Sequence, residues 1–273
     1  MDQTRELYLD LMKRCLLNLI YLDNEIINET FIPKNFFQKK IIDRFFTSRG
    51  LRVVRPGGPP NAENRVEGKD WPAWAHTMIG LKRLDNIQFC LEDIIKNNIP
   101  GDYIEAGVWR GGGSIFARAV FKAYDINDRL VWLADSFEGL PALDPEKYPL
   151  DKDSTLHEFK ILSVSLEKVK NNFEHYGLLD EQVRFLRGWF KETLPSAPMQ
   201  NLAVIRVDAD LYESTMNALS NLYPKLSRGG YIIIDDYGNI SACRQAVEDY
   251  RKSSGINAEI KAVDYTGVYW KRE

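Results

Sequence analysis

The sequence predicts an α/β fold with a mostly parallel sheet, a C-terminal antiparallel strand pair and an N-terminal helical extension. From residue 100 onward, short apolar runs alternate with amphipathic helical segments, which is typical of βαβ units. The last two apolar runs, 258–263 and 268–270, have no helix between them and so predict the antiparallel pair. Residues 1–75 lack this strand and helix alternation.

The elements follow in order along the chain. The spacing of the apolar residues among residues 7–20 (Leu7, Leu11, Leu16, Leu19 and Ile20) predicts a first amphipathic helix that packs on the main domain or on a partner chain. The Pro/Gly-rich patch 55–61 cannot continue a helix or a central strand, so we interpret it as a mobile loop. Strands are expected at 102–108, 130–134, 183–186, 202–207 and 231–234, with helices at 114–123, from about 165, at 213–226 and at 243–252.

Composition limits the classes of function. The chain has 273 residues, 44% of them hydrophobic, and a formal net charge of -3, so we expect neither a nucleic-acid partner nor a membrane partner. Three scattered cysteines favour neither a disulfide framework nor a zinc site, and they fit the reducing cytoplasm. We divide the chain into an arm and lid loop, 1–75, and a cofactor-binding domain, 76–273.

The first motif that indicates chemistry is a glycine-rich turn between the strand and the helix expected around residues 102–123. Glycine lets a ligand approach the backbone, and the N–H groups at the start of the helix favour a carboxylate or phosphate. Trp109 stands where the dinucleotide motif GxGxxG has its second glycine, and Glu105 suits a cationic ligand. S-adenosylmethionine has both an ammonium and a carboxylate, whereas the alternative is a purely structural turn. The candidate cofactor residues here are Glu105, Ala106, Gly107, Val108, Trp109 and Gly111.

A second motif starts at Asp135, which ends the next strand and could accept hydrogen bonds from ribose hydroxyls. This motif does not separate NAD from S-adenosylmethionine. Gly188-Trp189 follows the third strand, where an adenine would lie, although Trp189 could equally be core. The further candidates for the cofactor site are Thr77, Met78, Ser136 and Phe137.

The third motif is acidic. Asp208 and Asp210 follow the fourth strand, and Asp235 and Asp236 follow the fifth. Parallel neighbours would bring the four carboxylates to one sheet edge, where they repel one another unless a cation neutralises them. Ligands that are all oxygen favour a hard cation, Mg²⁺ first. The alternative is that these residues cap the following helices, as Asp210 could do.

Segments 105–114, 133–141, 185–195, 205–215 and 229–238, in this order, resemble the macrocin O-methyltransferase family, as do 7–23 and 75–87. This resemblance implies a Rossmann-like class I methyltransferase fold and transfer of a methyl group from S-adenosylmethionine to a hydroxyl of a sugar or other vicinal diol in a natural product.

The resemblance also implies residue roles. Asp208, Asp235 and Asp236 would bind the metal and Asp210 would be the general base, while Glu105, Asp135 and the glycine turn would hold S-adenosylmethionine, with Asp208 bordering that site. Residues 52–70 and 144–160 match no signature, so the acceptor stays open. His157, within 144–160, is the alternative base. We also expect a homo-oligomer. The rival functions are an NAD-dependent oxidoreductase and a non-catalytic cofactor-binding protein.

Overall fold

The computed structural model describes residues 2–22, 29–30, 48–49, 54–55 and 61–273. Most of the predicted Pro/Gly loop, 56–60, lies outside the described residues. Short strands β1 (Glu29–Thr30) and β2 (Val54–Arg55) pair antiparallel before the main domain. Among the described residues, no helix is long and apolar enough to cross a membrane.

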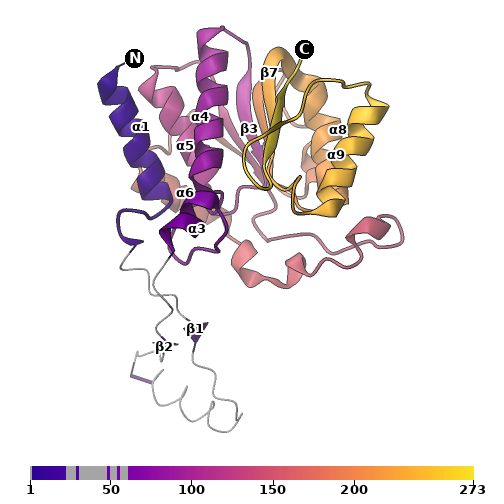
Figure 1. Cartoon of the computed structure of the whole chain (residues 1–273), viewed down its shortest axis with the longest axis horizontal. Helices are drawn as coiled ribbons and strands as arrows, with labels where there is room; N and C mark the ends of the chain where they lie inside the picture. Colours follow the sequence, from indigo (N-terminus) through magenta and orange to yellow (C-terminus); the bar gives the residue numbers. More distant parts are fainter. Residues whose placement is uncertain (1, 23–28, 31–47, 50–53, 56–60) are drawn as a thin grey trace.

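A seven-stranded sheet forms the centre of the molecule, and the predicted fold class is confirmed (Figure 1). Its first five strands in spatial order are parallel, and β9 then pairs antiparallel with both β7 and β8. The spatial order is β5 (Val183–Arg187), β4 (Val131–Asp135), β3 (Asp102–Ala106), β6 (Leu202–Val207), β7 (Leu226–Ile234), β9 (Val268–Lys271) and β8 (Lys261–Ala262).

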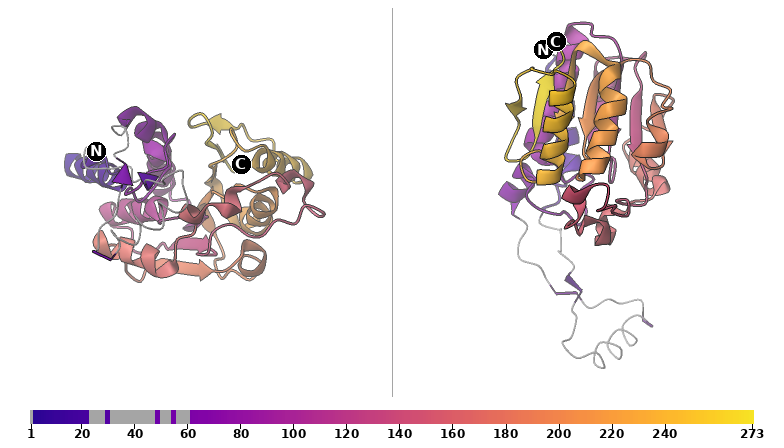
Figure 2. Two further views of the ribbon diagram at one scale, coloured as in Figure 1. Left: turned by 90° about the horizontal axis from the view of Figure 1, so that it is seen from below. Right: turned by 90° about the vertical axis from the view of Figure 1, so that its right-hand side faces the viewer.

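Helices cover both faces of this sheet, so the molecule has three layers (Figure 2). One apolar core joins the sheet to α4 (Gly80–Lys96), α5 (Gly112–Ala123) and α6 (Leu166–His175). The second core lies on the opposite face and contains α8 (Tyr212–Leu222) and α9 (Ser241–Ser253). The inner strands β3, β4 and β6 are almost fully buried, as expected of a parallel sheet with helices on both faces, whereas the edge strands β5 and β8 are partly or fully exposed.

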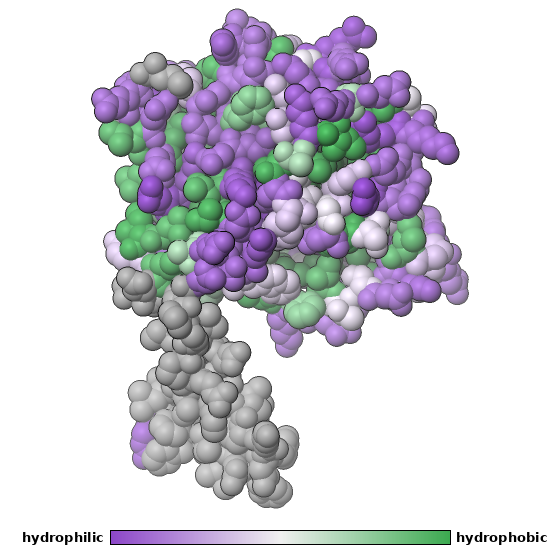
Figure 3. All heavy atoms as spheres, in the orientation of Figure 1, coloured by the Kyte–Doolittle hydropathy of each residue, from purple (hydrophilic) through white to green (hydrophobic). Residues whose placement is uncertain are grey.

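The first helix, α1 (Gln3–Leu16), packs against α5 and forms part of the first core. Its buried residues are Leu9, Met12 and Leu16. Two residues of the predicted apolar face, Leu7 and Leu11, do not pack on the main domain and are 66% and 52% exposed. Apolar side chains consequently lie on the surface on the α1 side of the molecule (Figure 3).

Four strand ends are aligned by hydrogen bonds that continue beyond the strands. The N–H of Gly107 donates to Ala134 O, and the N–H of Asp208 donates to Ala106 O, both at 2.9 Å. The N–H of Asp235 likewise donates to Val207 O at 2.9 Å. The residues that follow β3, β6 and β7 therefore lie at the same edge, where open α/β sheets bind ligands.

Candidate active site

A cavity of about 290 Å³ opens at the C-terminal ends of β3, β4, β6 and β7. Residues 139–162, drawn in pink below the sheet in Figure 1, contribute to its wall together with 68–71. Most of the predicted cofactor residues line this cavity: Thr77, Met78, Glu105, Gly107, Val108, Trp109, Asp135, Ser136, Trp189 and Asp208. The cavity also contains all four predicted acidic residues, Asp208, Asp210, Asp235 and Asp236.

Four other predicted cofactor residues do not line the cavity. Ala106 is buried in the core under α8 and α9, and the Phe137 side chain packs against Phe185 in the opposite core. A Cβ on Gly111 would lie 2.9 Å from Val169, so this turn packs against α6. Gly188 lies beside Thr193. Ala106 ends β3, and the other three residues belong to the turns that carry the lining residues.

Close approach explains the glycines at this edge. Gly107 has φ +89°, and a Cβ there would lie 1.8 Å from the carbonyl oxygen of Asp208. A Cβ on Gly113 would lie 2.3 Å from Glu105 Oε1. The turn after β3 thus packs directly on the loop that carries Asp208, and the start of α5 packs on the Glu105 carboxylate.

The two carboxylates predicted to hold S-adenosylmethionine already have partners. Asp135 accepts hydrogen bonds from the N–H groups of Val108 (2.8 Å) and Phe137 (2.7 Å). Glu105 is fully buried and accepts from the Ser114 hydroxyl and from Arg206 Nη1 (2.6 Å). Burial raises the pKa of Glu105 to about 7, against the lowering effect of Arg206. A carboxylate offers about four lone-pair sites, so both groups retain acceptor capacity.

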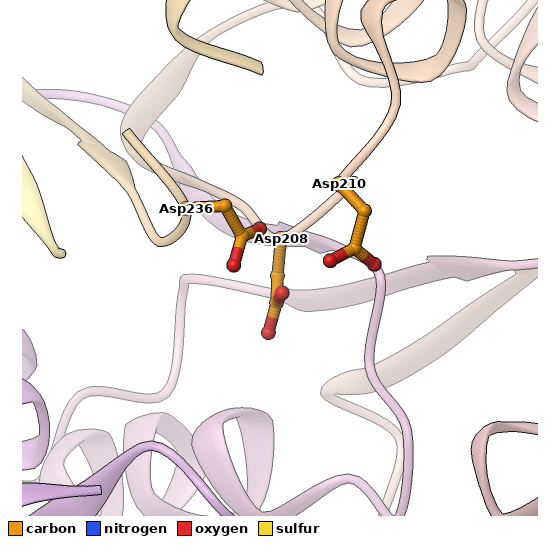
Figure 4. Close-up of side chains that lie close together, drawn as sticks. All are labelled: Asp208, Asp210 and Asp236. Carbon is orange, nitrogen blue, oxygen red and sulfur yellow. The ribbon is translucent and has the colours of Figure 1, made fainter. Parts of the chain in front are cut away.

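Three carboxylates form the acidic cluster, which we define as Asp208, Asp210 and Asp236 (Figure 4). One oxygen of each lies within 4.8 Å of the others. Burial, followed by the neighbouring negative charges, raises the pKa of Asp208 to about 6 and that of Asp210 to about 8. The same causes raise the pKa of Asp236 well above its ordinary value. The cluster therefore resists full ionisation without a cation.

Asp235 lies against two arginines. Its carboxylate accepts from Arg206 Nη2 and Arg83 Nη1, each at 2.5 Å, and Arg83 also pairs with Asp264. Arg206 further contacts Asp208 at 3.0 Å. Although burial opposes ionisation, the two guanidinium groups hold the pKa of Asp235 below its usual value.

Asp210 does not cap the next helix, contrary to the alternative considered from the sequence. The N-cap residue of α8 is Leu211, and the helix N–H groups of Tyr212 and Glu213 donate to Asp151 instead. Asp210 has φ 55°, a left-handed conformation that is uncommon outside glycine, although asparagine and aspartate adopt it more often than other residues. The alternative base, His157, is exposed and does not line the cavity.

Sequence reasoning did not find Arg83, Arg206, Asp151, Trp71 or Tyr265 as site residues. A signal existed for Arg206, because it is the one charged residue in the apolar strand 202–207. Tyr265 and Trp71 also line the cavity. Their positions near the site depend on tertiary folding, which the local sequence does not specify.

The acidic cluster fits a hard cation. Its ligands are all carboxylate oxygens, and one oxygen of Asp236 is buried without a hydrogen-bond partner. Such an unsatisfied buried oxygen is costly unless it coordinates something. Asp208 and Asp236, two of the three predicted metal ligands, are in the cluster. The third, Asp235, is not in the cluster, and each of its two carboxylate oxygens accepts a hydrogen bond from an arginine.

Residues 5–272 match the model of the macrocin O-methyltransferase family. The chain belongs to this family. It is 52% identical over 271 residues to 8-demethyl-8-(2,3-dimethoxy-alpha-L-rhamnosyl)-tetracenomycin-C 4'-O-methyltransferase of Streptomyces olivaceus, covering 99% of this chain and 94% of the relative. It is 47% identical over 270 residues to mycinamicin III 3''-O-methyltransferase of Micromonospora griseorubida, covering 98% and 96%. Like the other members of this methyltransferase family, the chain is an S-adenosylmethionine-dependent O-methyltransferase.

The solved structure of the O-methyltransferase NovP superimposes with a TM-score of 0.85 and 47% sequence identity, covering 98% of this chain and 99% of that chain. The structure of a calicheamicin methyltransferase has a TM-score of 0.59 at 18% identity, covering 88% and 95%, and supports the fold alone.

Proposed function

We propose that this O-methyltransferase acts on a sugar hydroxyl of a glycosylated natural product, with Mg²⁺ bound at the acidic cluster. The observation that carries the proposal is that the acidic cluster and the glycine turn share one cavity. A methyl donor bound at the turn would thus lie beside an oxygen held at the cluster.

The cofactor would use residues on three strand ends. Asp135 would accept from the ribose, and Trp189 would lie against the adenine. The glycine turn would approach the carboxylate of the methionine portion, while Glu105 would face its ammonium. Thr77 and Met78 would cover the cofactor. All these groups border the cavity, which supports the assignment.

Methyl transfer needs a nucleophilic oxygen in line with the methyl–sulfur bond. We assign Asp210 as the general base that removes the hydroxyl proton, because its carboxylate has no ion pair within the described part of the chain. Asp208 and Asp236 would hold Mg²⁺, and Asp235, the predicted third ligand, would share its carboxylate between the metal and the two arginines. When bound, Mg²⁺ acidifies a coordinated hydroxyl.

The acceptor class rests on the names of the relatives. One of them acts on a rhamnosyl-tetracenomycin, and another acts on mycinamicin III. The rim of the cavity supports a bulky acceptor, since Trp71 lines it and remains 49% exposed while making an edge contact with Phe159, which is 45% exposed. Exposed aromatic rings suit the apolar faces of sugars and aglycones.

The two alternative functions have less support than methyl transfer. An NAD-dependent oxidoreductase would need the dinucleotide turn that Trp109 interrupts, and a non-catalytic protein would not need the acidic cluster. The test is to incubate the protein with S-adenosylmethionine, Mg²⁺ and either a rhamnosylated polyketide or the same polyketide without its sugar. We expect the mass of one methyl group to be added only to the glycoside. Methylation of the polyketide that lacks the sugar would contradict the proposed acceptor class. Oxidation of the acceptor with NAD as the cofactor would contradict the proposed methyl transfer.

A further inference from the structure

Residues 141–163, which we call the lid segment, connect β4 to α6 across the mouth of the cavity. Every residue of this segment is exposed or half-buried except Asp151, which is 3% exposed. Asp151 ends the short 3-10 helix Pro149–Asp151. A carboxylate is the least expected side chain to be the buried one of an otherwise solvated segment, so its contacts require an explanation.

The Asp151 carboxylate is directed at the start of α8. Its Oδ1 accepts from the N–H of Tyr212 at 2.7 Å, and its Oδ2 accepts from the N–H of Glu213 at 3.1 Å. The N-cap residue, Leu211, has no side chain that could accept these protons. Asp151 therefore supplies, from a distant segment, the capping that helices usually obtain from their own N-cap.

Asp210, the proposed base, lies close to this contact along the chain. It lies two positions before Tyr212, and within the described chain its carboxylate accepts no hydrogen bond that would orient it. Its placement comes from its backbone, with φ 55° and a tight turn in which the Leu211 N–H donates to Ala209 O at 2.5 Å. Anchoring of Tyr212 and Glu213 fixes the C-terminal side of this turn.

A second contact holds the lid segment on the cofactor side of the cavity. Trp109, in the glycine turn, donates from Nε1 to Ile161 O at 2.8 Å. The lid segment thus contacts the cofactor turn through Ile161, and through Asp151 it contacts the start of α8, which directly follows the loop of Asp210.

We propose that Asp151 is a positioning residue that sets the backbone turn of Asp210 when the lid segment is docked. The inference rests on the proposed function, because it takes Asp210 as the base. Asp151 itself does not line the cavity and touches neither the acidic cluster nor the cofactor turn. Its loss should therefore lower kcat while the affinity for S-adenosylmethionine is retained.

The experiment compares Asp151→Ala, Asp151→Asn and the exposed control Asp153→Ala in the full-length protein. For each we would measure kcat with the rhamnosylated acceptor, the Kd for S-adenosylmethionine, and the rate of trypsin cleavage after Lys152 and Lys160. We expect Asp151→Ala to lower kcat by about 10²-fold, the usual cost of misplacing a reacting group by about 1 Å. Trypsin should cleave its lid segment faster, and its cofactor Kd should not change. Asn retains a capping oxygen, so Asp151→Asn should recover part of kcat, and Asp153→Ala should behave as the wild type.

Wild-type kcat in Asp151→Ala would overturn the inference and leave the proposed function standing. A parallel loss of kcat and cofactor affinity, without recovery in Asp151→Asn, would also overturn it, because that pattern marks a purely structural residue. Absence of methyl transfer by the wild type, or full activity of Asp210→Asn, would overturn the proposed reaction or base and this inference with it.

Discussion

Asp210 differs from Asp208 and Asp235 in its charge environment. Arg206 contacts both of those residues, whereas no cation contacts Asp210 among the residues that the structure describes. We expect Asp210→Asn to lower turnover by about 10²–10⁴-fold, the usual contribution of a general base. The affinity for S-adenosylmethionine should persist, because Asn keeps the shape of the side chain. The affinity for Mg²⁺ should fall less than in Asp208→Asn, because Asp210 is not one of the assigned metal ligands.

The matched variant is Asp208→Asn, which should weaken Mg²⁺ binding and regain part of its activity at high Mg²⁺ concentration. Turnover and Mg²⁺ affinity measured for both variants separate a base from a metal ligand. Near wild-type turnover in Asp210→Asn would remove it as the base.

For individual site residues, the sequence predicted the proximity of Asp208, Asp210 and Asp236, because neighbouring parallel strands end at one edge of the sheet. It could not predict the arginines that hold Asp235. Arg83 lies 152 residues from Asp235 in the chain, and only the packing of α4 brings them together. Asp151, 61 residues before Tyr212, was missed for the same reason.

The turn between β3 and α5 leaves no space for a side chain at Gly107. In Gly107→Ala, the added Cβ would meet the Asp208 carbonyl oxygen at a position with φ +89°. Overpacking of about 1–3 kcal/mol and a left-handed penalty of about 1–2 kcal/mol together predict a loss of roughly 2–5 kcal/mol in the free energy of unfolding. Cofactor binding should also be lost, since the turn and the Asp208 loop must separate.

Gly177→Ala is the matched control. Gly177 also has positive φ, +62°, but a Cβ there would meet nothing within 4 Å. Only the left-handed penalty of about 1–2 kcal/mol applies. Urea unfolding followed by circular dichroism would measure both variants, and equal losses would show that the contact with Asp208 is unimportant.

The parallel strands β3, β4 and β6 were predicted well because each is mostly apolar and buried in the middle of the sheet. β6 has the predicted bounds, 202–207, whereas β7 begins at Leu226, five residues earlier than the apolar run 231–234. The extension was not predicted, because residues 227–230 (Ser-Arg-Gly-Gly) do not form an apolar run. The helix α3 (Ala62–Glu67) follows the predicted loop 55–61 and was not predicted, although Asn61 caps it with a typical side-chain contact.

For the whole molecule, the acidic cluster links metal binding to stability. The folded-state pKa values of Asp208 and Asp210, about 6 and about 8, lie above their ordinary value of 3.8. A group with a raised pKa favours the folded state when protonated, so its contribution is complete at low pH and is lost as pH rises through 6 and 8. Mg²⁺ should offset this loss by neutralising the carboxylates.

We therefore expect the increase in Tm on adding Mg²⁺ to be small near about pH 5 and larger near about pH 9. Differential scanning fluorimetry would measure it, with Asp236→Asn expected to reduce the effect and Asp153→Asn to leave it unchanged. An Mg²⁺ effect that does not depend on pH would argue against binding at the cluster.

Two further features of the whole chain stay predictions. The division at residue 75 separates an arm from the cofactor domain, although α1 itself packs into the core on α5. A homo-oligomer is expected, and the exposed Leu7 and Leu11 of α1 are candidate contact residues. Light scattering would test this by comparing the molar mass of the wild type with that of a Leu11→Glu variant.

The most direct test of the central claim is turnover of the rhamnosylated acceptor with S-adenosylmethionine, followed by mass spectrometry, with Mg²⁺ and with excess chelator. If a metal bound at the acidic cluster activates the sugar hydroxyl, the glycoside gains one methyl group only when Mg²⁺ is present, and added Mg²⁺ restores activity after chelation. Full turnover in excess chelator would contradict the metal-dependent mechanism.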